Sequence, residues 1–188
     1  MTIEPGFSTV KPRLDEAVAA GDPATIAQQV KSALQDALRC NGLQLPDRFR
    51  ASRRDTYARR LLHRDADGRY TVVVMTWGPG QGTALHDHAG IWCVECVVDG
   101  RMHVTQYDLL SEQGGTYRFA PQNCVTAERG AAGCLIPPFE YHTLANARAD
   151  AASITLHVYG GEMDHCHVFE PASDGAYRRV TRTLSYHD

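Results

Sequence analysis

Short runs of β-forming residues follow one another through the later part of this chain, from about residue 69 onward. They are separated by turns such as Gly78-Pro79-Gly80 and Asp99-Gly100, which favour sharp reversals of the backbone. Many short strands at regular spacing are typical of a sandwich or barrel, so we expect a mostly β protein. The predicted strands cover residues 70–77, 91–98, 102–107, 117–120, 153–159 and 178–184.

The earlier part of the chain has a helical pattern. Apolar residues recur at helical spacing over residues 14–40, and Asp22-Pro23 supplies an N-cap followed by a first-turn proline. A further helix is predicted over residues 46–62, because that stretch carries no strong breaker before Asp67-Gly68.

The two parts are expected to form one domain over residues 1–188. A chain of 188 residues is long enough for one well-buried core, and no linker, repeat or low-complexity segment divides it. The helical segment, about residues 12–62, is therefore predicted to cover one side of a barrel formed by residues 69–185.

Charge and composition exclude several classes of partner. The formal net charge of -3 gives no broad basic field for a phosphate backbone, so nucleic acid is not expected. Residues 1–11 lack the features of a signal peptide, and no later run is apolar enough to span a bilayer. We expect a cytoplasmic monomer or small homo-oligomer that binds no membrane, with its six cysteines as reduced thiols except for one possible modification at Cys93.

His86 and His88 stand one residue apart, so on an extended segment both imidazoles point to the same face and can reach one metal ion. The residues around the pair resemble the two sequence motifs of the cupin superfamily. That resemblance implies a single jelly-roll cupin barrel and a third metal ligand after the pair. It is carried by the His86/His88 pair together with Gly80, Gly100, Pro137, His142 and Asn146.

Cys93 stands where most metal cupins place a glutamate ligand, and Glu95 lies two residues too late for that position. A site without the carboxylate would have three neutral imidazoles as ligands, unlike the facial triad of many iron oxygenases. Such a metal keeps its full positive charge and would favour an anionic ligand such as a thiolate. The alternative is that Cys93 is a small buried apolar residue, as most free cysteines are.

Residues 153–159 alternate strictly between apolar and polar side chains, as one strand with two unlike faces. The apolar face carries Ile154, Leu156 and Val158, and the polar face carries Ser153, Thr155, His157 and Tyr159. Periodicity alone favours a polar face in water. In a cupin, however, the polar face can line the barrel interior.

With these residues the chain resembles the cysteine dioxygenase family over about residues 57–169. The resemblance rests on the His-Asp-His pair, the cysteine in place of the cupin glutamate, the distant third histidine and the Thr-x-His-x-Tyr strand. It implies that one Fe(II) ion is the cofactor. The implied ligands of that ion are His86, His88 and His142.

The same resemblance implies roles for the polar strand. Tyr159 would lie beside the substrate and dioxygen, and His157 and Thr155 would hold its hydroxyl through a hydrogen-bonded relay. Cys93 would be placed to form a thioether with Tyr159. Such a cross-link would hold the phenol rigidly near the reacting atoms.

Substrate choice depends on one arginine. In cysteine-selective members of the family, an arginine from a Tyr-x-Arg sequence pairs with the substrate carboxylate, and Tyr57-Ala58-Arg59 has that pattern. The alternative is that Arg59 and its neighbours form a solvated helix face. Tyr159 is followed by Gly160-Gly161 and not by the Ser-Pro-Pro common in the family, so the pocket wall is expected to differ there.

The implied activity is addition of both atoms of O2 to the sulfur of L-cysteine, giving cysteine sulfinate, with a small thiol and O2 as the only partners. Three alternatives stay open: a dioxygenase of 3-mercaptopropionate or mercaptosuccinate, a metal cupin of another reaction class such as an isomerase, and a non-catalytic sensor. The segment 165–167 could bind a second metal, but a structural strand is the favoured interpretation. His63 and His103 are expected to have no chemical role.

Overall fold

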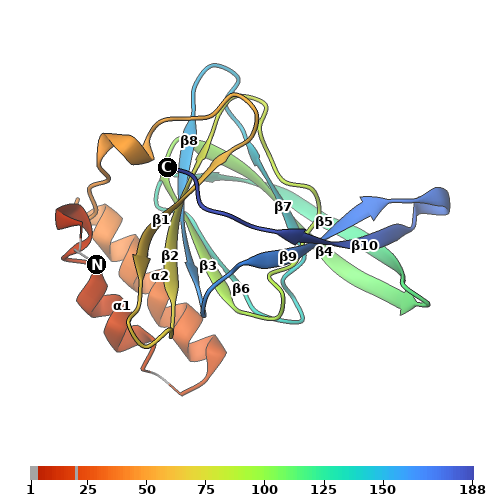
Figure 1. The fold of residues 1–188 in the computed structure, drawn as a ribbon, viewed down its shortest axis with the longest axis horizontal. Helices are drawn as coiled ribbons and strands as arrows, with labels where there is room; N and C mark the ends of the chain where they lie inside the picture. The colour runs from red at the N-terminus through yellow and green to blue at the C-terminus, as the bar shows by residue number, and fades with distance from the viewer. Residues whose placement is uncertain (1–3, 20) are drawn as a thin grey trace.

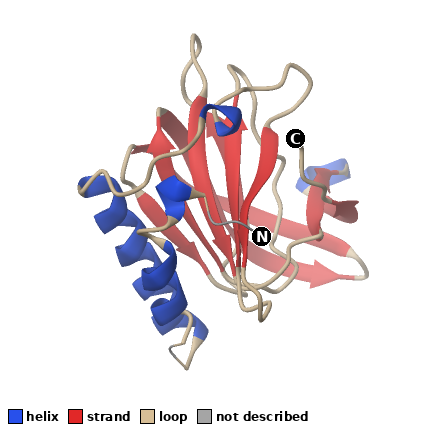
Figure 2. Ribbon diagram, turned by 60° about the vertical axis from the view of Figure 1, so that its left-hand side comes forward, coloured by secondary structure: helices blue, strands red, loops and turns tan. Residues whose placement is uncertain are grey.

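The computed structural model describes residues 4–19 and 21–188. Two five-stranded sheets, in which all pairings between the named strands are antiparallel, face each other and enclose a barrel, and the helices lie against the outside of one of them (Figures 1 and 2). The first sheet has the order β1-β2-β8-β3-β6 and the second β7-β4-β5-β10-β9. This confirms the predicted mostly β cupin (jelly-roll) barrel with an N-terminal helical segment packed on it.

The helices are α1 (Lys11–Ala17) and α2 (Pro23–Arg39), with short 3-10 turns at Pro5–Phe7, Asp47–Phe49 and Ser173–Gly175. The strands are β1 (Ala58–Arg64), β2 (Thr71–Trp77), β3 (Cys93–Asp99), β4 (Arg101–Gln113), β5 (Thr116–Glu128), β6 (Ala132–Leu135), β7 (His142–Asn146), β8 (Ser153–Tyr159), β9 (His165–Pro171) and β10 (Tyr177–Thr183).

The predicted start of α2 is confirmed. The side chain of Asp22 accepts hydrogen bonds from the backbone N–H groups of Ala24 at 3.1 Å and Thr25 at 3.0 Å. These two N–H groups have no partner inside the helix, so the cap stabilises its first turn.

The apolar faces of the central strands pack against α2. Leu156 on β8 and Val94 on β3 are fully buried in one cluster with Val30 and Leu34 of the helix. Each such side chain contributes about 1.5–3 kcal/mol by leaving water. This layer fixes which face of β3 and β8 points away from the barrel interior.

The polar face of β8 therefore points inward. Every residue of β8 is buried, including Thr155 and His157. The expectation from periodicity alone, that this face meets water, is wrong. The apolar residues of β8 already have a partner in the helical layer, so the polar residues line the barrel.

The predicted helix over residues 46–62 is also wrong. That stretch contains the short turn Asp47–Phe49 and then enters strand β1, in which Arg59 pairs with Met75 of β2. Pairing along the edge of the sheet outweighs the local helical preference of the arginine-rich sequence. Strand β1 was not anticipated from the sequence, and neither were β6 and β7.

The six cysteines, all within the described residues, are free thiols. None of the helices in the described ranges is long and apolar enough to cross a membrane.

Candidate metal centre and substrate pocket

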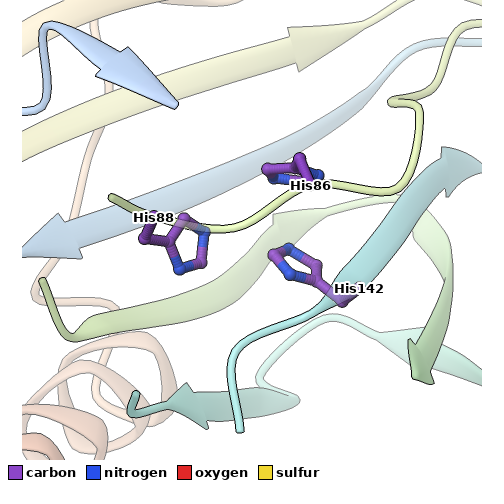
Figure 3. Close-up of side chains that lie close together, drawn as sticks. All are labelled: His86, His88 and His142. Carbon is purple, nitrogen blue, oxygen red and sulfur yellow. The ribbon is translucent and has the colours of Figure 1, made fainter. Parts of the chain in front are cut away.

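Three imidazoles meet inside the barrel (Figure 3). His86 and His88 lie on the extended segment between β2 and β3, while His142 begins β7. The backbones of His86 and His142 are joined by two hydrogen bonds of 3.2 and 3.3 Å, which hold the segment against β7. The ring centroids are 4.3 Å apart for His86 and His142, 5.0 Å for His88 and His142, and 5.5 Å for His86 and His88.

The ring nitrogens of this cluster differ in their hydrogen-bond partners. The Nδ1–H of His86 donates to the carbonyl of Ala84 at 3.0 Å, and the Nδ1–H of His142 donates to the carbonyl of Glu140 at 2.9 Å. Nε2 of His86 therefore presents its lone pair, whereas Nε2 of His142 lies 3.1 Å from Oε1 of Glu95, at hydrogen-bonding distance. Both ring nitrogens of His88 are buried without a hydrogen-bond partner.

An unpartnered buried nitrogen costs about 1–3 kcal/mol, which a bond to a metal would offset. Burial lowers the pKa of His86 to about 3 and that of His88 well below its usual value, with the neighbouring His142 acting in the same direction. Neutral imidazoles are the form that binds metals, and His86 and His88 are held in that form. Burial acts in the same direction on His142, but the neighbouring Glu95 outweighs it and raises the pKa of this ring. The three predicted ligands are thus brought together, two of them in the metal-binding form.

Asp87 anchors the segment that carries the histidine pair. Its carboxylate accepts hydrogen bonds from the backbone N–H of His167 at 2.9 Å and of Ala89 at 3.0 Å, and it lies 2.8 Å from Nδ1 of His167. Residues 165–167 belong to β9, so the favoured interpretation of a structural strand is confirmed. Through Asp87, His167 holds the segment with the histidine pair against β9.

Glu95 lies closer to the histidine cluster than its place in the sequence indicated. Its Oε1 is 3.1 Å from Nε2 of His142 and 4.0 Å from Nε2 of His88, so a carboxylate borders the three predicted ligands. Residues two apart on a strand point to the same face, so Glu95 enters the barrel beside Cys93. That periodicity was the signal in the sequence that could have found it.

The polar residues of β8 form a chain that leads to Glu95. The Nε1–H of Trp77 donates to the hydroxyl of Thr155 at 2.9 Å, and this hydroxyl lies 2.7 Å from Nε2 of His157. Thr155 can therefore donate its own proton to Nε2, which places the other proton on Nδ1 of His157. That nitrogen lies 3.2 Å from Oε1 of Glu95.

Tyr159 and Cys93 lie next to this chain. They are direct cross-strand partners between β8 and β3, and both are buried. Burial raises the pKa of each group well above its usual value, while a hydrogen bond between them acts in the opposite direction on Cys93. The rings of His157 and Tyr159 stack nearly parallel with centroids 5.9 Å apart. The predicted hydrogen-bonded relay is present from Thr155 to His157. Its extension from His157 to the hydroxyl of Tyr159 stays a prediction.

A small cavity of about 20 Å³ joins these groups to β1. Its lining includes the two residues predicted to bind substrate, together with residues of the metal centre and of β8: Tyr57, Arg59, His86, Glu95, His157 and Tyr159. Tyr57 stacks on Trp77 with ring centroids 4.4 Å apart.

Arg59 is a buried cation and not part of a solvated helix face. Its side chain is held by the carbonyls of Met163 at 2.7 Å and Ser185 at 3.5 Å, and its guanidinium lies 4.5 Å from the ring centroid of Tyr186. Its Nε–H is buried without a partner. Arg59 thus brings a positive charge and one unused donor to the cavity wall.

Gly160 follows Tyr159 where the resemblance led us to compare it with a Ser-Pro-Pro sequence, and the glycine at this position has a local structural cause. A Cβ at this position would lie 2.3 Å from Nε1 of Trp92, and the backbone N–H of Gly160 donates to the carbonyl of Trp92 at 2.9 Å. The indole of Trp92 occupies the space that a side chain at position 160 would need.

Comparison with known proteins agrees with the motifs. The family model described as Cysteine dioxygenase type I matches residues 22–172. The cysteine dioxygenase type 1 of Rattus norvegicus is 23% identical over 128 residues, which cover 68% of this chain and 62% of the rat protein. The Homo sapiens protein is 22% identical with the same shares covered. The chain therefore spans less than two thirds of the length of these curated relatives.

Solved structures with a related outline are more distant. A protein from Thermus thermophilus aligns with a TM-score of 0.49 and 17% identity, over 63% of this chain and 96% of that one. A Klebsiella pneumoniae protein with a double-stranded β-helix domain aligns with a TM-score of 0.47 and 18% identity, over 61% and 80%. The family model, in contrast, spans most of the sequence, and on that basis the chain belongs to the cysteine dioxygenase type I family.

Proposed function

We propose that this protein is a mononuclear non-haem iron(II) dioxygenase that adds both atoms of O2 to the sulfur of L-cysteine. The observation that carries the proposal is the convergence of three histidines, with both nitrogens of buried His88 unpartnered, beside the Cys93/Tyr159 pair. Membership of the cysteine dioxygenase type I family supports the reaction class.

Iron(II) held by His86, His88 and His142 would supply the redox chemistry that lets a thiol react with dioxygen. The overall change is RSH + O2 to RSO2H. Two S–O bonds form, sulfur gives up four electrons, and dioxygen accepts them. The thiol proton remains as the proton of the sulfinic acid, so no external reductant takes part.

Arg59 would orient the substrate by its carboxylate. It contributes a full positive charge and a free Nε–H in a buried wall, where an ion pair is strong because little water screens it. Its contacts with Met163 and Ser185 fix the guanidinium before substrate arrives. Preorganisation of this kind reduces the entropy lost on binding.

Tyr159 would place its hydroxyl beside the reacting sulfur, and Cys93 would hold the phenol in position from the opposite strand. His157 and Thr155 would keep the polar wall of the barrel in one hydrogen-bonding arrangement. These are positioning roles, and they follow from the register of β3 and β8.

The test is anaerobic loading with iron(II), followed by oxygen uptake and product analysis. L-cysteine, 3-mercaptopropionate and mercaptosuccinate are compared as substrates. We expect one sulfinate per O2 consumed. A fully iron-loaded protein that oxidises none of the three thiols would overturn the proposal, and a preparation that never retains a transition metal would favour a non-catalytic ligand sensor.

A further inference from the structure

Glu95 is a buried carboxylate on β3. It is 9% exposed, it faces the barrel interior, and it pairs across the sheet with His157. Burying a carboxylate is costly unless a cation or several hydrogen bonds compensate. Its ion-pair partners among the described residues are three imidazoles, those of His88, His142 and His157.

Glu95 and His142 meet at the histidine cluster. Oε1 of Glu95 lies 3.1 Å from Nε2 of His142, a distance that a hydrogen bond spans when this nitrogen carries a proton. A metal ion bound by both atoms would replace that proton and balance the carboxylate charge.

The distances from Glu95 to His142 and to His88 suit a shared ion. Ligand atoms about 2.1 Å from one ion lie about 3 Å apart when they subtend a right angle and about 4 Å apart at a wide angle. Oε1 of Glu95 stands at 3.1 Å from His142 Nε2 and at 4.0 Å from His88 Nε2. His88, Cys93 and Glu95 also bring ligand atoms within 4.8 Å of one another, as the three histidines do.

The other nearby cation does not serve Glu95. Arg59 lines the same cavity, but its terminal nitrogens donate to the backbone carbonyls of Met163 and Ser185. The carboxylate is therefore left to the histidine cluster and to whatever cation the cluster holds.

We propose that Glu95 is a fourth ligand of the metal, which gives a centre of three imidazoles and one carboxylate. The carboxylate comes from two residues beyond Cys93 on the same face of β3, and it occupies one of the positions that a three-histidine centre would leave open. It also cancels one unit of the positive charge on the ion.

A fourth protein ligand limits which thiols the metal can bind. This step rests on the proposed function, which makes a thiol the substrate. A metal ion with about six coordination positions has two of them left when four are filled by protein ligands. A thiol that chelates through sulfur and amine would fill both and leave none for the second substrate. Glu95 therefore selects thiols bound through sulfur alone, for which an amino group is dispensable, so 3-mercaptopropionate is expected to serve as well as L-cysteine.

The test uses Co(II) loaded anaerobically into the full chain, with visible absorption and a competing chelator as readouts. We expect Glu95→Gln to change the ligand-field spectrum and to weaken Co(II) binding by about 100-fold. Glu128→Gln makes the same change at an exposed glutamate of β5 and is the matched control, with spectrum and affinity close to those of the unmodified protein. An unchanged Glu95→Gln spectrum, or the same change in Glu128→Gln, would overturn the assignment.

Rescue by a small carboxylate distinguishes the loss of a metal ligand from misfolding of the variant. Glu95→Ala leaves room for a small carboxylate, so acetate should restore the original spectrum, whereas chloride at equal ionic strength should not. Failure of acetate to restore it in a folded variant counts against the assignment.

Thiol binding to the Co(II) protein tests the selectivity without turnover. We expect L-cysteine and 3-mercaptopropionate to bind with similar affinity, and Glu95→Gln to favour cysteine by about tenfold because the freed position admits the amine. A marked preference for cysteine in the unmodified protein would contradict the selectivity. Every readout here is anaerobic, so a protein that oxidises no thiol would refute the proposed function and leave this result standing.

Discussion

Cys93 and Tyr159 are direct partners in the antiparallel register of β3 and β8, and both belong to the cluster inside the barrel. The ring of Tyr159 is also 5.7 Å from that of His88, centroid to centroid. The thiol and the phenol are thus held together at the edge of the metal centre by the sheet itself.

We expect this pair to become a thioether when the iron-loaded protein is exposed to a thiol and O2. Tryptic digestion should then yield one linked species whose mass is the sum of the Cys93 and Tyr159 peptides less two hydrogen atoms. Cys93→Ser should abolish that species. Separate, unmodified peptides after extended turnover would show that the pair does not react.

Arg59→Ala should raise the KM for L-cysteine by about 10- to 100-fold with little change in iron content, because a charged hydrogen bond to the substrate carboxylate is lost. Steady-state oxygen uptake measures the effect. Arg59→Lys should recover part of the lost affinity for L-cysteine. Arg64→Ala changes an exposed arginine of the same strand and should leave the KM unaltered. Unchanged kinetics for Arg59→Ala would remove this residue from the pocket.

His88→Ala should lose most of its bound metal, because the remaining imidazoles would have to hold the ion with one neutral ligand fewer. Metal analysis after desalting gives the readout. His103→Ala changes an exposed histidine of β4 and serves as the control. Equal metal content in both variants would place the ion elsewhere.

Asp65 should make stability depend on pH. Three nitrogens of Arg69 donate to its carboxylate at 2.8–3.1 Å, and these hydrogen bonds hold the pKa of Asp65 well below its usual range. A lowered folded-state pKa stabilises the protein above the unfolded pKa of about 4, and this contribution is lost as the pH falls below it.

Asp65→Asn should therefore lower the free energy of unfolding by about 1–3 kcal/mol at neutral pH, and the difference should shrink on acidification. Urea denaturation at several pH values measures it. Asp150→Asn changes an exposed aspartate and should have little effect. A loss for Asp65→Asn that persists unchanged at low pH would mean that the ion pair is not its cause.

Local patterns in the sequence were enough to predict much of this protein. The alternation of residues 153–159 coincides with β8, and Asp22 caps α2 through its own side chain. The His86/His88 pair indicated the candidate metal centre together with the motif residues around it, because their spacing is itself a geometric constraint. Each of these depends on residues close together in the chain, whose relationship is decided by backbone periodicity.

Only the tertiary structure decided which face of each strand points into the barrel and what meets there. The helical layer covers the apolar face of β8, and this turns His157 inward. The same layer places Glu95 beside His142, although 47 residues separate them. Arg59 became a buried residue of a strand because β2 offered a pairing edge that no local pattern could reveal. Register and layer packing act over distances in sequence that periodicity does not reach.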